Sequence, residues 1–268
     1  MNRFLVGLVC LAVVGCSPEE GGSSAGSSAP SLADLNVQLK MPSFEITDDN
    51  GSSIAQAGLG SVELADVDLP DRSLPIQNRQ LRTTSTLDCN PGTLSSTVTS
   101  NDIDASTSEF NISGSHKTVN LFDNCTLFGV ELNGQITADL YWTGYSAATN
   151  DFDSTSFAVT FVNYSTSYSL TGETSVDGAV SGAVIGTTTT TDWALSVSSS
   201  ATNGEILTSE TTTSVVKNDD DTYLSAGAWI INGANDTSVL TTVVPNGLEI
   251  SINGGQATLV AWVDLEDF

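Results

Sequence analysis

The sequence predicts an all-β protein, an antiparallel meander of about a dozen strands curled into a barrel-like or half-barrel sheet, because twisted sheets beyond roughly ten strands curl or split. A two-sheet β-sandwich is the alternative. Three observations favour this class. Ser, Thr and Gly are abundant while Lys and Arg total 7; apolar residues alternate with polar ones from about Leu94 onward; and turn signals separate these runs without helical patterns between them. Such successive strands pair as antiparallel neighbours.

The clearest alternation covers residues 130–142. One parity is apolar and the other is polar, which indicates a strand with one buried face. The apolar parity comprises Val130, Leu132, Gly134, Ile136, Ala138, Leu140 and Trp142. The Asn133-Gly134 pair inside this run also signals a two-residue hairpin. That hairpin would bring Glu131 onto the face of Ile136, so a continuous strand or a longer bulged turn is favoured.

Further strands follow the same period of two along the chain. Their inward positions are Phe157, Val159 and Phe161, then Val176, Val180 and Val184, then Trp193, Leu195 and Val197, and finally Leu248, Ile250 and Ile252. The sequence therefore predicts one β-rich domain over residues 31–268. Residues 31–85 are less regular, and we expect there a short helix capped by Ser31, a strand at 43–46, and loops that wrap the main sheet.

The first residues have the character of a signal peptide. Arg3 precedes an apolar run of about a dozen residues, which is too short for a membrane span of roughly 20 residues. The run ends in Val13, Val14, Gly15 and Cys16. These residues resemble the lipobox of bacterial lipoproteins, a resemblance that covers only the first 16 residues.

The resemblance implies cleavage after Gly15, a diacylglycerol on the Cys16 sulfur and an acylated amino terminus, with palmitate as a typical chain. Two or more acyl chains anchor a protein stably in a bilayer. The alternative is an ordinary signal peptide that is cut elsewhere, with Cys16 as an unrelated cysteine. Ser17 follows the cysteine instead of Asp, which implies delivery to the outer membrane, on its periplasmic face or at the cell surface.

Residues 16–30 are predicted to form the lipidated cysteine and a flexible linker. The segment consists almost entirely of Ser, Gly, Ala, Pro and Glu. A coil of about 14 residues has an average reach of about 20 Å. The domain would therefore hang close to the membrane surface.

The formal net charge is −25, from 32 acidic and 7 basic residues. A surface of this sign repels nucleic-acid backbones and anionic lipid faces, so we expect no nucleic-acid partner. The hydrophobic content of 39% is sufficient for a core, which argues against a disordered chain.

Cys89 and Cys125 remain in the predicted domain once Cys10 is removed and Cys16 is lipidated. Two cysteines in an exported domain usually form a disulfide. A redox pair or a pair of metal ligands is the alternative, although the chain has no C-x-x-C spacing and only one histidine.

Few residues indicate catalysis. His116 is the single histidine and lies in a polar, turn-like stretch, and the chain has no G-x-S-x-G elbow. Acidic clusters at 47–52, 150–154 and 218–222 do not complete a calcium-loop pattern and are expected to be solvated hairpin tips. We expect no cofactor and no resident metal.

Two groups of residues are candidate ligand or partner contacts. Tyr141, Trp142 and Tyr145 are close in sequence and could stack on a glycan or anchor a protein partner; packing in the core and at its rim is the alternative. Arg72, Arg79 and Arg82 are concentrated in one segment of an acidic chain and would pair with nearby carboxylates or dock a partner.

These observations predict a non-enzymatic lipoprotein whose β-rich domain is a binding or structural module of the bacterial cell envelope, with an envelope protein or a glycan as partner. The first alternative is a carrier that holds a lipid or another apolar ligand in a curled sheet. The second is a hydrolase that uses acidic residues. The ligand and the oligomeric state are not determined by the sequence.

Overall fold

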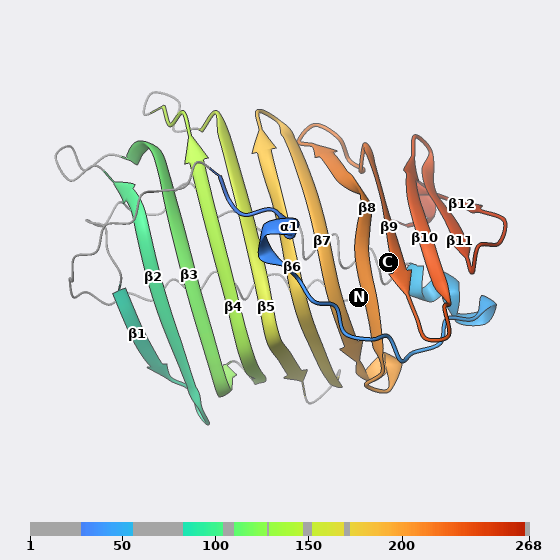
Figure 1. Cartoon of the computed structure of the whole chain (residues 1–268), viewed down its shortest axis with the longest axis horizontal. Coiled ribbons are helices and arrows are strands. Elements are labelled where there is room, and N and C mark those ends of the chain that lie inside the picture. Colours follow the sequence, from blue (N-terminus) through green and yellow to red (C-terminus); the bar gives the residue numbers. More distant parts are fainter. Residues whose placement is uncertain are drawn as a thin grey trace.

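A computed structural model describes residues 28–55, 83–103, 110–127, 129–146, 152–168 and 172–265. Twelve antiparallel strands form one open sheet in which every strand pairs with its neighbours in sequence, from β1 at one edge to β12 at the other (Figure 1). The predicted all-β meander is confirmed. The sheet curves without closing into a barrel, and the described strands form one sheet instead of the two of a sandwich.

The first strand and the last four strands are short, and the seven strands between them are long. They are β1 (Thr83–Asp88), β2 (Thr93–Ile103), β3 (Phe110–Leu127), β4 (Val130–Thr143), β5 (Ser154–Tyr168), β6 (Gly172–Ile185), β7 (Thr188–Ser199), β8 (Ile206–Asn218), β9 (Ala226–Asn232), β10 (Ser238–Val244), β11 (Gly247–Ile252) and β12 (Thr258–Ala261). The short helices α1 (Leu32–Leu35), η2 (Ser200–Thr202) and η3 (Trp262–Asp264) also belong to the described chain, together with a helical segment at residues 48–55.

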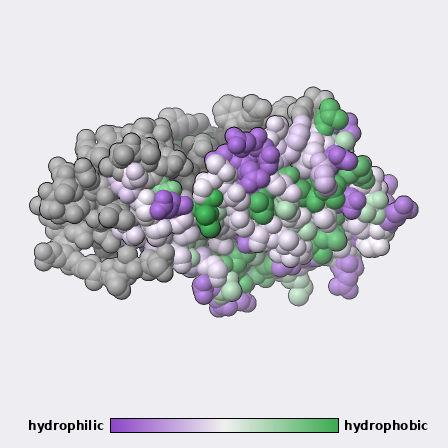
Figure 2. Space-filling view, turned by 90° about the horizontal axis from the view of Figure 1, so that it is seen from above, coloured by the Kyte–Doolittle hydropathy of each residue, from purple (hydrophilic) through white to green (hydrophobic). Residues whose placement is uncertain are grey.

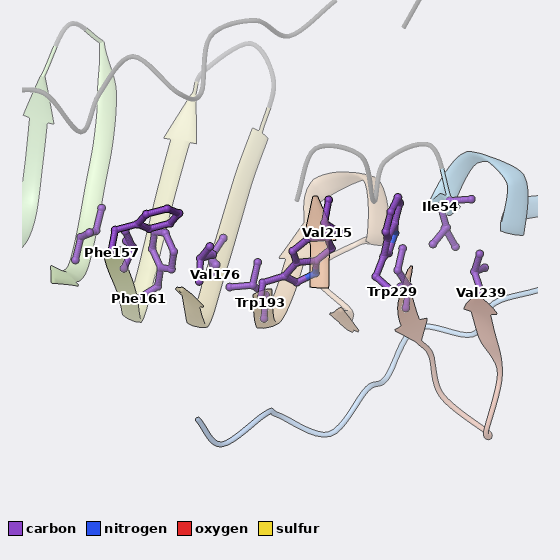
Figure 3. Packing of buried hydrophobic residues seen from close by; sticks show 14 of the residues in the cluster. Ile54, Phe157, Phe161, Val176, Trp193, Val215, Trp229 and Val239 are labelled. Carbon is purple, nitrogen blue, oxygen red and sulfur yellow. The ribbon is translucent and has the colours of Figure 1, made fainter. Parts of the chain in front are cut away.

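One face of the sheet, called the apolar face below, carries the core. Trp193 and Leu195 of β7, Val180 of β6, Trp229 of β9 and Val239 of β10 have no exposed surface. Figure 3 shows side chains of this cluster rising from the same side of successive strands. Trp193 and Trp229 lie near its centre, with ring centroids 5.7 Å apart. The alternation in the sequence therefore identified the buried face of the sheet.

The Asn133-Gly134 pair lies inside the continuous strand β4, as the alternation favoured. The register between β4 and β5 shifts at this point, from Asn133↔Ser165 to Gln135↔Val162. Gly134 has φ +92°, a conformation that glycine adopts without strain. The extra residues of the bulges lie in β3 and β5, and the Asn133-Gly134 pair lies opposite them within β4 and does not form a hairpin turn.

Register shifts at this level of the sheet form a row that crosses four strands, from β3 to β6. On β3 and β5, Asn124 and Asn163 adopt left-handed conformations, with φ of 48° and 47°. Their backbone N–H groups donate to side chains of the next strand, Asn124 to Asn133 Oδ1 at 2.7 Å and Asn163 to Asp177 Oδ1 at 2.5 Å. Each acceptor precedes a glycine of positive φ, Gly134 or Gly178. Bulges increase local twist and bend a strand, so a repeated pair of hairpins, β3–β4 and β5–β6, carries part of the curvature.

The other face, called the polar face below, is crossed by the segment 29–46, called the strap below. Figure 1 shows the strap in front of the central strands, and Figure 3 shows its blue trace on the side of the strands opposite the core residues. The strap begins with α1, whose N-cap Ser31 and Asp34 form a capping box. The predicted helix capped by Ser31 is confirmed. Residues 43–46 form no strand, contrary to the prediction, although their backbone is bonded to the sheet.

The chain passes from the strap to the apolar face at the β10–β11 end of the sheet. Residues 48–55 are helical, and Ile54 and Ala55 are buried in the core cluster. The cluster 47–52, expected to be a hairpin tip, is instead the start of this helix. The side chain of Asn50 accepts from Thr47 N at 2.8 Å, so these polar residues act in capping the helix.

Candidate functional site

The strap is attached to the polar face at points spread over several strands. Near its start, Ala29 N donates to Ser156 Oγ of β5 at 2.8 Å. Further along, Lys40 N donates to Ser196 Oγ of β7 at 2.8 Å. The Nζ atom of Lys40 forms an ion pair with Asp177 of β6. The strap therefore bridges the centre of the sheet through hydroxyl and carboxylate side chains.

The second half of the strap is bound mainly through its backbone. The N–H groups of Ser43 and Phe44 both donate to the carbonyl of Ile206, at 2.9 and 3.1 Å, and Ile206 N donates to Ser43 Oγ at 2.9 Å. Ala234 N donates to the carbonyl of Phe44 at 2.7 Å. The last contact is Ile46 N with Thr237 Oγ1 at 3.0 Å. These bonds fix residues 43–46 in an extended conformation without making them a strand.

The strap covers residues that alternation alone assigns to solvent. On the polar face, small side chains of β5, β6 and β7 are buried, namely Ala158, Ala179, Ser181 and Ser196. Within the strap Leu35, Val37 and Leu39 are partly covered, while Asn36, Gln38 and Lys40 are exposed. The small side chains of the sheet thus give a shallow surface that accepts one apolar edge of an extended segment.

Two aspartates of the polar face are paired with lysines. Lys117 of β3 and Asp139 of β4 are 3.0 Å apart, and the Asp139 side chain is 9% exposed. Asp177 is 15% exposed and pairs with Lys40. Buried carboxylates are costly unless they are paired. Two of the three lysines in the described part of the chain therefore neutralise carboxylates on the face that the strap crosses.

The candidate aromatic contacts are divided between the two faces. Trp142 is 4% exposed on the apolar face and lies 5.6 Å from Phe152, measured between ring centroids. Tyr145 lies 5.2 Å from the same ring. Tyr141 has the opposite parity and is partly exposed on the polar face. The arrangement favours packing for Trp142 and Tyr145, and Phe152, which the sequence analysis did not single out, joins them.

Cys89 and Cys125 form a disulfide, with Cα atoms 5.1 Å apart. Cys125 has no exposed surface. The bond connects the end of β1 to β3, across β2. It is a covalent link within the sheet, and the predicted disulfide is confirmed.

His116 lies in β3, and the prediction that it lies in a turn-like stretch is wrong. It is opposite Leu140 of β4 in the register and is partly buried. Its Nε2 atom lies 3.2 Å from Thr118 Oγ1. The stretch 114–118 appeared turn-like because Ser and Gly are common in it, but pairing on both sides makes it a strand.

Within the described ranges, no group of three or more His, Cys, Asp or Glu side chains is arranged to hold a metal ion. In the turn after β8, the Asp221 carboxylate instead accepts from Asn218 Nδ2 and Ser225 Oγ, both at 2.8 Å. These bonds lower the pKa of Asp221 below its ordinary value of 3.8, the bond from Asn218 contributing most.

Several predicted residues lie outside the described residues. These are the proposed lipidation site Cys16, the linker up to residue 27, and the basic trio Arg72, Arg79 and Arg82. None of the helices within the described part is long and apolar enough to span a bilayer. In the view from above, apolar residues of the described part lie in separate spots among polar ones (Figure 2).

Comparisons with known proteins returned no match. No family model, no curated protein and no solved structure is significantly similar to the chain. The arrangement of the described residues is therefore the only guide to function beyond the sequence.

Proposed function

We propose that this chain is a lipoprotein anchored in the bacterial outer membrane through Cys16, with a non-catalytic β-rich domain that acts as a binding or structural module of the envelope. The observation that carries the proposal is the order of elements at the amino terminus. A sequence that resembles a lipobox is followed by a Ser/Gly-rich linker and then, from Ala29, by a strap bonded to the sheet.

The strap supports anchoring because it gives the tether a defined attachment. Its contacts with β5, β6, β7 and β8 are spread over the polar face and would distribute a pull from the membrane. An anchor joined directly to a loop tip would place the same pull on one turn.

The character of the polar face supports a structural or binding role. Two of its carboxylates in the described part, Asp139 and Asp177, are occupied by lysine partners. Trp193 and Trp229, on the apolar face, have no exposed surface. This close packing does not favour a carrier with a hollow interior.

The anchoring is tested on the full chain expressed in a bacterial envelope. The amino-terminal peptide is analysed by mass spectrometry, and the membrane fraction is compared for wild type, Cys16→Ser and Cys10→Ser. We expect a triacylated Cys16, loss of membrane association in Cys16→Ser, and no change in Cys10→Ser, whose residue leaves with the signal peptide. An amino terminus without lipid, whichever residue the mature chain begins with, contradicts the anchor.

The binding role is tested by cross-linking the anchored protein in envelope extract and by glycan arrays. Recovery of one defined protein or glycan, whose binding is lost when the domain is mildly unfolded, supports a binding module. A catalytic turnover of envelope substrates that depends on one Asp or Glu contradicts the non-catalytic assignment.

A further inference from the structure

The two edges of the sheet differ in how they end. β12 has four residues (Thr258–Ala261) and leads directly into η3 (Trp262–Asp264). Trp262 of η3 stacks on Tyr223 with ring centroids 5.0 Å apart. A very short strand followed by a packed turn is a common way to protect a sheet edge from association.

Within the part of the chain that the structure describes, β1 has none of these protective features. It has six residues, Thr83–Asp88, and pairs with β2 without any register shift. It contains no Pro, Gly, Lys or bulge, and its three Thr residues favour strands. Of the side chains described in β1, Thr84, Thr86, Leu87 and Asp88 are exposed.

The backbone of β1 presents hydrogen-bonding groups away from β2. Cys89 N donates to the carbonyl of Gly92 at 3.0 Å in the β1–β2 turn. In an antiparallel pair, hydrogen-bonded positions alternate along the strand. The odd-numbered residues therefore face β2, and the N–H and C=O groups of Thr84, Thr86 and Asp88 point outward.

The end of β1 is fixed by a covalent bond. Cys89, directly after Asp88, is bonded to the fully buried Cys125 of β3. This link restrains the edge in its extended form and lowers the entropy that a new strand pairing would cost.

From these observations we infer that β1 pairs with β1 of a second copy of this chain, antiparallel and about a two-fold axis at Thr86. This register places Thr84 opposite Asp88 of the second copy, so all three outward-facing residues of each strand are used. Each such pair exchanges two backbone hydrogen bonds. The two copies present the same edge, as a closed two-fold dimer requires.

Charge selects the antiparallel arrangement. Asp88 is the single charged residue of β1. Parallel pairing in register would place it against Asp88 of the second copy, and like charges directly opposite each other are destabilising. The antiparallel register places each carboxylate beside a threonine hydroxyl, which can donate to it.

Cross-linking of the full chain in detergent solution tests the dimer without relying on the lipid anchor. Residues opposite each other in a hydrogen-bonded antiparallel pair have Cα atoms about 5.5 Å apart, a distance that suits a disulfide. Thr86→Cys should form a disulfide-linked dimer on mild oxidation. Thr258→Cys places the same exposed change on the opposite edge, β12, and the unmodified chain controls for dimers through Cys10 or Cys16.

We expect severalfold more dimer with Thr86→Cys than with either control. Equal dimer from Thr86→Cys and Thr258→Cys would indicate random collision and overturn the inference. A disulfide from Thr86→Cys to a different envelope protein, with no self-dimer, would overturn the choice of a second copy as partner.

A backbone test complements the cross-link. Thr86→Pro removes an outward N–H that β2 does not use, and proline is tolerated on edge strands. Thr86→Val keeps that N–H. The inference predicts a monomer for Thr86→Pro and a dimer for Thr86→Val by sedimentation, with the same circular dichroism for both. A dimer that persists in folded Thr86→Pro would contradict pairing through β1.

Discussion

Gly134 of β4 lies against the backbone carbonyl of Asn163 in β5: a Cβ atom on Gly134 would be 2.2 Å from that oxygen. Gly134 also has φ +92°, and the adjacent Asn133 accepts the N–H of Asn124. The bulge row thus depends on close backbone contact as much as on the conformational freedom of glycine.

Gly134→Ala should therefore destabilise the protein by more than about 2 kcal/mol, since both a strained φ and a steric clash are introduced. Gly204→Ala is the matched control. Gly204 has φ +79° but no atom within 4 Å of the added Cβ, so only the conformational cost of about 1 kcal/mol applies. Chemical denaturation gives both values, and equal losses would show that the contact with Asn163 is unimportant.

The buried hydroxyl of Thr241 offers a second test. Thr241 has no exposed surface, and neither its Oγ1 nor the Nε1 of the opposite Trp229 has a hydrogen-bond partner. Thr241→Val keeps the shape of the side chain and removes an unpaired polar atom. We expect it to raise the free energy of unfolding by about 1 kcal/mol.

Ser209→Ala is the opposite case. Ser209 Oγ accepts from Trp193 Nε1 at 2.9 Å in a buried site. Removing the acceptor leaves the indole N–H unpaired and should cost about 1 to 3 kcal/mol. Urea unfolding should show a higher free energy of unfolding for Thr241→Val and a lower one for Ser209→Ala. A loss of stability in Thr241→Val would contradict the account of the core.

The Lys40–Asp177 ion pair should hold the strap against the sheet. Lys40→Met removes the cation and leaves a largely buried carboxylate, so we expect faster proteolysis within the strap and a loss of about 1 kcal/mol. Lys117→Met removes the other lysine partner of the polar face without touching the strap. Cleavage sites mapped by mass spectrometry should move into the strap only in Lys40→Met. Identical cleavage patterns in the two variants would show that the Lys40–Asp177 ion pair does not hold the strap on the sheet.

The start of the strap should respond to acid. Bonds from the Ser31 side chain and backbone lower the pKa of Asp34 below its ordinary 3.8. A lowered folded pKa means that the stabilisation is complete above the unfolded value and is lost as the pH falls through the folded value. Loosening of α1 should thus begin only below pH 3.8.

The Ser31 amide resonance should report this change during an acid titration. In Asp34→Ala, which has no carboxylate to titrate, the acid-dependent part of the signal should be absent. A Ser31 resonance that moves at neutral pH would show that another group controls the cap.

The sequence alone determined the strands and their buried face. Alternation at Val130, Leu132 and Ile136 identified the buried side of β4, because a period of two assigns neighbouring residues to opposite faces. Paired cysteines predicted the disulfide between Cys89 and Cys125, and Ser31 predicted the cap of α1. These features depend on neighbours in sequence or on residue type.

Only the tertiary structure decided what covers the polar face and where the strands end. Ala158 and Ser196 appear solvent-facing in the sequence, yet the strap buries them, since its extended backbone bonds to residues more than a hundred positions away. His116 belongs to a strand because β2 and β4 pair with it on both sides. The sheet remains open because β1 and β12 lie at opposite edges, and closure depends on accumulated twist and bulges that no local pattern specifies.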